Sequence, residues 1–96
     1  MSKGKLQKKH RFAIRLSCIA RIEIDDSVVV VVDDEWRSQF YNLHSIRDIA
    51  KHIGYNMIVN LASLSQLDGW ADQPDENAIF VASPDWEVDE IEFEFT

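Results

Sequence analysis

Two histidines and an aspartate recur at four-residue spacing and could ligate a metal ion. On one helix, His44, Asp48 and His52 would follow one another along a single face, about 6 Å apart. Imidazole and carboxylate groups are common ligands of zinc and other transition metals. The set would span about 12 Å, however, whereas each ligand must approach one ion to about 2 Å. We therefore interpret this face as solvated and predict no metal site on it.

The sequence also lacks motifs for nucleophilic catalysis, phosphate binding and calcium binding. Cys18, the only cysteine, falls on the expected core face of a strand, and no serine lies in a Gly-x-Ser-x-Gly motif. The three glycines are too scattered for a phosphate-binding loop. Asp68, Asp72, Asp75 and Glu76 do not have the spacing of an EF-hand. We expect no catalytic residues, no metal and no cofactor, and therefore not an enzyme.

Charge is divided between a basic N-terminal segment and an acidic remainder. Residues 1–21 hold seven of the 10 Lys and Arg and no acidic residue. All 17 Asp and Glu follow from Glu23 onward, and the net charge is −7. This division argues against nonspecific nucleic-acid binding by the acidic part and favours a basic partner.

Length and composition predict one domain. We expect a basic flexible arm over 1–10 and a single compact α+β domain over 11–96, a size that supports one modest core. A single cysteine is typical of a reducing compartment, so we expect a cytoplasmic protein. The apolar runs are far shorter than the roughly 20 residues of a membrane helix, and we expect no contact with a membrane.

Alternation of apolar and polar residues predicts strands at both ends of the domain. Residues 14–24 alternate over more than ten positions, and 79–82 form a short apolar run. A further strand should end the chain, with a change of phase at Asp89-Glu90 that indicates a bulge or tight turn.

Helical spacing is clearest after Ser45, which is placed to cap a helix. Ile49, Ile53 and Met57 lie at the centre of its apolar stripe, and Gly69 is placed to end it after about Leu67. A shorter helix should precede it over residues 33–41, because acidic residues favour a helix N-terminus.

Residues 28–32, five consecutive valines, are ambiguous. Their β-branched side chains favour a strand, but helical recurrence with Trp36 and a cap at Asp26 or Ser27 leaves a helix open. The predicted fold is a small antiparallel sheet of three to four strands, packed on one long amphipathic helix with a short helix before it.

Two surfaces are candidate partner-binding sites. The first is Trp70 in an acidic loop, flanked by Asp68 and Asp72, where an exposed aromatic side chain could anchor a basic partner. The alternative is a tryptophan folded back over the helix end. The second is a row of carboxylates on the last strand, Glu90, Glu92 and Glu94, which could mimic a phosphate backbone. The alternative there is pairing with Arg15 and Arg21, which requires the first and last strands to be neighbours.

Two stretches, DDEWRSQFYNLH (33–44) and LSQLDGWADQPDEN (64–77), resemble small uncharacterised phage and prophage proteins. Small acidic phage proteins often bind and block a host protein, and this resemblance carries no specific activity or functional residues.

We therefore expect a non-enzymatic protein-binding module that docks on a basic, nucleic-acid-binding host protein and modulates or inhibits it. The alternative function is a nucleic-acid-binding accessory protein, which would use the lysines of the N-terminal arm: Lys3, Lys5, Lys8 and Lys9. The sequence does not identify the partner or the oligomeric state.

Overall fold

The structure is a computed structural model that describes the backbone of residues 9–95 and their side chains, except those of residues 91–93 and 95. The chain divides into two compact units, one formed by its two ends and one by residues 20–84. We call them the ribbon unit and the helical unit and describe each by itself. That residues 11–96 form a single domain stays a prediction.

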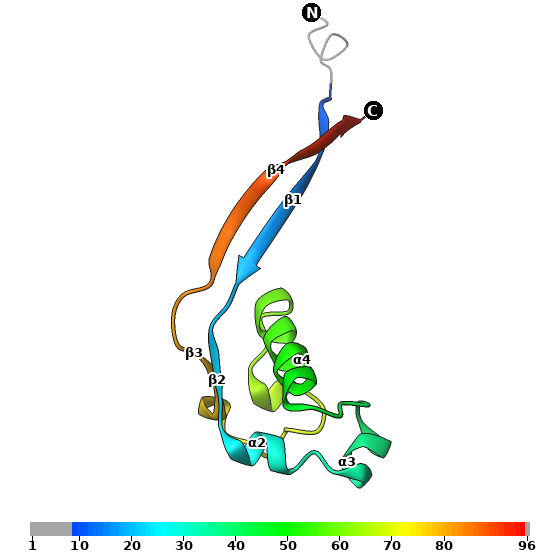
Figure 1. The fold of residues 1–96 in the computed structure, drawn as a ribbon, viewed down its shortest axis with the longest axis vertical. Coiled ribbons are helices and arrows are strands. Elements are labelled where there is room, and N and C mark those ends of the chain that lie inside the picture. The colour runs from blue at the N-terminus through cyan, green and yellow to red at the C-terminus, as the bar shows by residue number, and fades with distance from the viewer. Residues whose placement is uncertain (1–8, 96) are drawn as a thin grey trace, which may run out of the picture. The chain divides into compact units, whose positions relative to one another are not determined.

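The ribbon unit consists of two long antiparallel strands. β1 (Arg11–Ile19) pairs with β4 (Asp85–Phe95), so the first and last strands are neighbours, as the pairing alternative required (Figure 1). Leu16 is the Cα partner of Val88 and Arg15 is the partner of Glu90, so Asp89 has no partner across the pair. The change of phase at Asp89-Glu90 is therefore an irregularity of the bulge type, which confirms that prediction.

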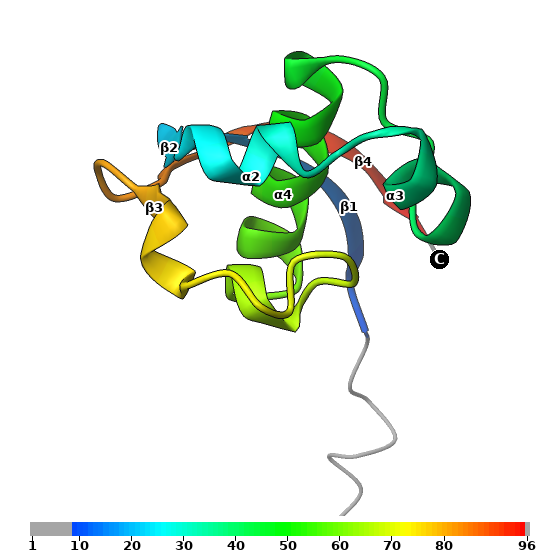
Figure 2. The same cartoon turned by 90° about the horizontal axis from the view of Figure 1, so that it is seen from below.

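The helical unit contains the remaining elements. They are β2 (Ile22–Ile24), α2 (Asp26–Val30), α3 (Asp34–Gln39), α4 (Ile46–Val59), two short 3-10 helices at Leu64–Gln66 and Asp75–Asn77, and β3 (Ala78–Phe80). β2 and β3 pair as a second antiparallel sheet of two strands. Figure 2 shows α4 at the centre of this unit, with α2, α3 and β3 around it.

The core of the helical unit is centred on the apolar stripe of α4. Ile49, Ile53 and Met57 are buried, as predicted. Residue 54 faces β2, because a Cβ added to Gly54 would lie 3.3 Å from Cδ1 of Ile22. The absence of a side chain at this position therefore allows the helix to approach the strand closely.

Two predicted helix starts are confirmed by their caps. The side chain of Ser45 accepts a hydrogen bond from the amide of Asp48, which fixes the start of α4. The side chain of Asp33 accepts from the amide of Trp36 at 2.8 Å and starts α3. Both caps satisfy amide groups that have no partner within the first turn of a helix.

The preference for a strand over residues 28–32 is wrong, because α2 covers the first three of these valines. Asp25 is the N-cap, and its carboxylate accepts both the amide and the hydroxyl of Ser27. Val28 is completely buried in the core. The cap and this burial outweigh the weak intrinsic preference of valine for strands.

The predicted end of the long helix is also wrong. α4 stops at Val59, and its C-cap Asn60 is followed by Leu61 in the left-handed region at φ 51°. The amide of Ala62 then turns back to the carbonyl of Asn56 at 3.1 Å. The chain therefore ends the helix with a leucine in a conformation that usually requires glycine or asparagine.

The α+β class agrees with these elements, but the sheet does not have three to four strands. The predicted strand over 14–24 breaks at Ala20-Arg21, and each of its parts pairs in a different two-stranded sheet. Alternation in the sequence continues through this break and therefore does not reveal it.

Candidate protein-binding surface

The register of β1 and β4 assigns the ribbon two different faces. Side chains alternate along a strand, and residues paired across an antiparallel sheet share a face. One face carries Phe12, Ile14, Leu16 and Cys18 from β1 with Val88 and Trp86 from β4, and we call it the apolar face. The opposite face carries Arg11, Arg15, Ser17 and Ile19 with Glu90, Glu87 and Asp85, and we call it the charged face.

The apolar face is largely open to solvent. Phe12, Ile14, Leu16, Trp86 and Val88 are between 45% and 63% exposed, and Cys18 is half-buried. The expectation that the face of the strand with Cys18 lies in the core is therefore wrong. Alternation distinguishes two faces of a strand but does not say what covers either of them. Contiguous exposed apolar side chains of this kind often mark an interaction surface.

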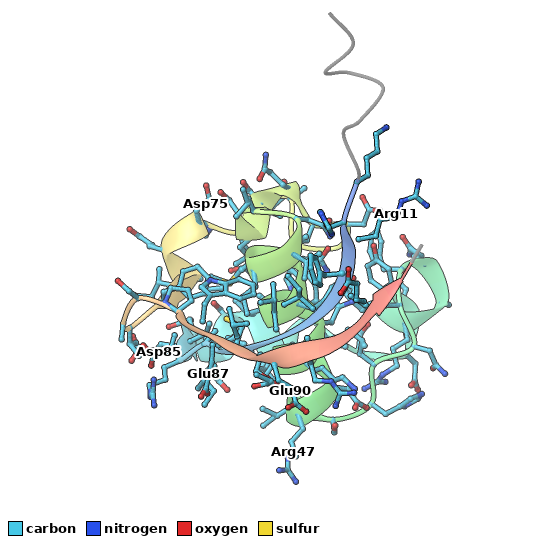
Figure 3. All side chains as sticks on the ribbon, turned by 90° about the horizontal axis from the view of Figure 1, so that it is seen from above. Arg11, Arg47, Asp75, Asp85, Glu87 and Glu90 are labelled. Atoms are coloured by element: carbon cyan, nitrogen blue, oxygen red, sulfur yellow. The ribbon has the colours of Figure 1, made fainter. Side chains whose placement is uncertain are left out.

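The charged face and the bulge carry most of the exposed carboxylates of β4. Asp85, Glu87 and Glu90 follow one another along the strand in Figure 3. Glu90 is the Cα partner of Arg15, and Glu87 is the partner of Ser17. The hydroxyl of Ser17 donates a 2.7 Å hydrogen bond to Asp89. β4 has six acidic residues against two arginines on β1, so the ribbon has an excess of negative charge.

Glu90, Glu92 and Glu94 do not form the predicted row, because the pairing of β1 and β4 has a second register shift. The partners of β4 shift between Ala13 and Ile14, and Glu94 consequently pairs with Phe12 on the apolar face. Glu90 therefore lies on the opposite face from Glu94, and the side chain of Glu92 lies outside the described part of the chain. At its own end of the strand, Glu94 lies 3.6 Å from His10 Nδ1.

The prediction of Trp70 as a surface anchor is wrong. Its side chain is 1% exposed, and its indole packs on that of Trp36 with ring centroids 4.8 Å apart. This agrees with a tryptophan folded back into the protein. Asp68 and Asp72 are exposed on either side of it, without an aromatic anchor between them. Sequence reasoning missed Glu87 and Trp86 instead, and the alternation of β4 before the bulge was the signal for both.

The pattern His44, Asp48, His52 does not form one site. His44 precedes the helix and contacts Asn42 Oδ1 at 2.6 Å, whereas His52 packs against Tyr41 with ring centroids 4.2 Å apart. His44 and Asp48 are exposed, as the interpretation of a solvated face required, whereas His52 is half-buried and its Nε2 is buried without a hydrogen-bond partner. Burial lowers the pKa of His52 below its usual value.

A surface pocket of about 440 Å³ is lined by residues 42–55, namely Asn42, Leu43, Asp48, Lys51, His52 and Tyr55. The buried Nε2 of His52 is not accessible from it for proton transfer. Within the described residues, no three His, Cys, Asp or Glu side chains come together as metal ligands. The packing of His52 therefore supports a structural role.

The arm proposed for nucleic-acid binding is mostly outside the described residues. Lys3, Lys5 and Lys8 lie there, and Lys9 is exposed just before β1. None of the helices in residues 9–95 is long and apolar enough to span a membrane. No protein-family model, curated protein or solved structure matches this chain.

Proposed function

We propose that this chain is a non-enzymatic protein-binding module whose charged face docks on a basic protein and modulates or inhibits it. The observation that carries the proposal is the set of exposed carboxylates on one ordered strand, Asp85, Glu87 and Glu90. Glu87 and Asp85 are two residues apart, so their Cα atoms are separated by about 6.6 Å. Lysines or arginines at a similar spacing on a partner would be complementary to this strand.

The sign of the charge selects the class of partner. A nucleic acid would be repelled by the acidic strand, whereas a nucleic-acid-binding protein offers the basic surface that this strand fits. A role in binding a host protein also agrees with the resemblance of residues 33–44 and 64–77 to small phage proteins. Asp68 and Asp72 form a second acidic surface, but no ordered strand positions them.

The test compares two charge reversals of equal size. The double substitution Glu87→Lys/Glu90→Lys changes the charged face, and Asp68→Lys/Asp72→Lys changes the loop by the same amount. A protein captured by the wild-type chain is purified, and its association with each variant is measured by surface plasmon resonance at low and moderate salt. Circular dichroism establishes that both variants are folded.

We expect the ribbon variant to slow association at least about tenfold at low salt, because exposed charges mainly affect the encounter rate. The loop variant should associate at nearly the wild-type rate. Equal association rates for the ribbon variant and the wild type would refute the proposal. If association slowed only for the Asp68→Lys/Asp72→Lys variant, the interface would lie at Asp68 and Asp72 instead.

A further inference from the structure

The apolar face of the ribbon unit has no function in the proposal above. Two strands alone are marginally stable in water, and a ribbon normally needs a third strand or a packed layer. Here the middle of the face is occupied by Leu16 and Val88, which are Cα partners and are 57% and 63% exposed. Something should therefore cover this face.

We propose that a second copy of this chain covers it, so that two ribbons stack through their apolar faces as a symmetric dimer. The six residues of the apolar face carry no charge, so identical copies bring no like charges together over them. A charged side chain on this side of the ribbon, Glu94, lies at one end of the face beside His10. The charged faces remain outward in this dimer, so the inference goes beyond partner binding and does not depend on it.

The area available is sufficient for a weak specific dimer. Burying an aliphatic side chain removes roughly 60–120 Å² from water, and an aromatic one removes more. Five side chains that are about half exposed on each copy therefore bury roughly 500–900 Å² in total, which is below the range of stable interfaces and fits a weak, transient one. An interface of this size is expected to be transient, so the dimer should exchange with the monomer rather than be permanent.

Charge at one end of the face selects the orientation. Glu94 lies there beside His10 of its own chain. A two-fold axis along the strands places Glu94 over β1 of the second copy, near that copy's His10. An axis across the strands would instead place this carboxylate over Trp86 of the second copy, where it would lose hydration without a partner. We therefore infer the axis along the strands.

Sedimentation equilibrium of the full chain, from low-micromolar to near-millimolar concentration, tests the dimer with matched variants. Leu16 and Ile19 are 57% and 60% exposed on the same strand but on opposite faces. Leu16→Asp should raise the dissociation constant at least about tenfold, because it places a carboxylate in the apolar contact. Ile19→Asp should change it by less than about threefold.

A monomeric wild type throughout this range, or equal effects of the two variants, would overturn the dimer. Leu16→Ala provides a milder change if Leu16→Asp does not fold, and an undiminished dimer for Leu16→Ala also overturns it. If the protein is monomeric but its charged face still binds a partner, only the dimer inference is refuted. If the protein dimerises but shows no charge-dependent partner binding, only the proposed function is refuted.

Orientation is measured by the distance between spin labels at Ile19→Cys in a Cys18→Ala background. With the axis along the strands, both labels lie at the same end, separated mainly by the sheet spacing of about 10 Å and the label lengths. With the axis across the strands, they lie at opposite ends of nine-residue strands, roughly 30 Å apart along the ribbon. A long distance in a sedimenting dimer would contradict the stacking that we infer.

Discussion

The indole nitrogen of Trp70 donates a 3.0 Å hydrogen bond to the carbonyl of Val28, across 42 residues of sequence. Both side chains are almost completely buried. The bond joins α2 to the loop that follows the first 3-10 helix and satisfies two polar groups inside the core. An aromatic residue surrounded by acids in the sequence therefore belongs to the interior of the helical unit.

Substitution of Trp70 should measure how much this contact contributes to the free energy of unfolding. We expect Trp70→Phe to lower the free energy of unfolding by about 1–3 kcal/mol, because a buried carbonyl loses its donor. Trp70→Ala should lower it by about 3–5 kcal/mol through the cavity. Urea denaturation measures both. Tyr55→Ala is the control, since Tyr55 is 59% exposed and its loss should cost less than about 1 kcal/mol. Equal losses for Trp70→Ala and Tyr55→Ala would contradict the burial of Trp70.

The glycines at 54 and 69 should differ in how much stability is lost on substitution by alanine. Gly69 has φ +94°, and a Cβ there would overlap the indole ring of Trp36. Gly69→Ala should therefore lower the free energy of unfolding by about 2–4 kcal/mol. Gly54→Ala removes a flexible residue from a helix and meets only the end of the Ile22 side chain, so its cost should stay below about 1 kcal/mol. Thermal denaturation of the pair distinguishes them, and a smaller loss for Gly69→Ala than for Gly54→Ala would refute the turn geometry.

Leu61 offers a stabilising substitution. It is 84% exposed and adopts φ 51°, which costs a residue with a Cβ about 1–2 kcal/mol. Leu61→Gly should raise the free energy of unfolding by about 0.5–1 kcal/mol, part of the gain being offset by the greater freedom of glycine in the unfolded chain. Val59→Gly, two residues earlier and still helical, should lower it by up to about 1 kcal/mol. If urea denaturation showed Val59→Gly to be more stable than Leu61→Gly, α4 would not end at Asn60.

Stability should fall as the pH decreases through the range of His52. Because burial lowers its pKa in the folded protein, the unfolded chain binds a proton more readily than the folded chain below about pH 6.5. The contribution of His52 is therefore fully present above about pH 6.5 and is lost progressively as the pH falls toward the folded pKa.

His52→Phe keeps an aromatic ring between Tyr41 and Trp70 and should flatten the pH dependence between about pH 7.5 and about pH 5.5. His44→Gln alters an exposed histidine and should keep the wild-type slope. Urea denaturation at several pH values provides the measurement. An unchanged slope for His52→Phe would assign the pH dependence to other groups.

Local signals predicted the helix starts and the bulge, because each depends on neighbouring residues alone. Ser45 and Asp33 cap through side chains that bond within three residues. The change of parity at Asp89 is likewise visible in the order of polar and apolar residues. The burial of Ile53 followed from the helical period, which requires only that one face of α4 meets a core.

The wrong predictions concern features that depend on contacts between residues far apart in the sequence. Val28 is held in a helix partly by Trp70, and the strand preference of valine cannot report that contact. The apolar face of β1 was assigned to the core because alternation reports two faces but not which element covers them. The prediction that Glu90, Glu92 and Glu94 share one face was wrong because the register shift opposite Ala13 and Ile14 depends on pairing across the ribbon.

The unpaired position of Asp89 also bears on how this strand tolerates deletions during evolution. Loss of the Asp89 codon would remove the residue without a Cα partner, together with its hydrogen bond from Ser17, and leave Val88 opposite Leu16 and Glu90 opposite Arg15. The ribbon can therefore shorten by one residue without exchanging its two faces, whereas a strictly regular strand would turn every later side chain over.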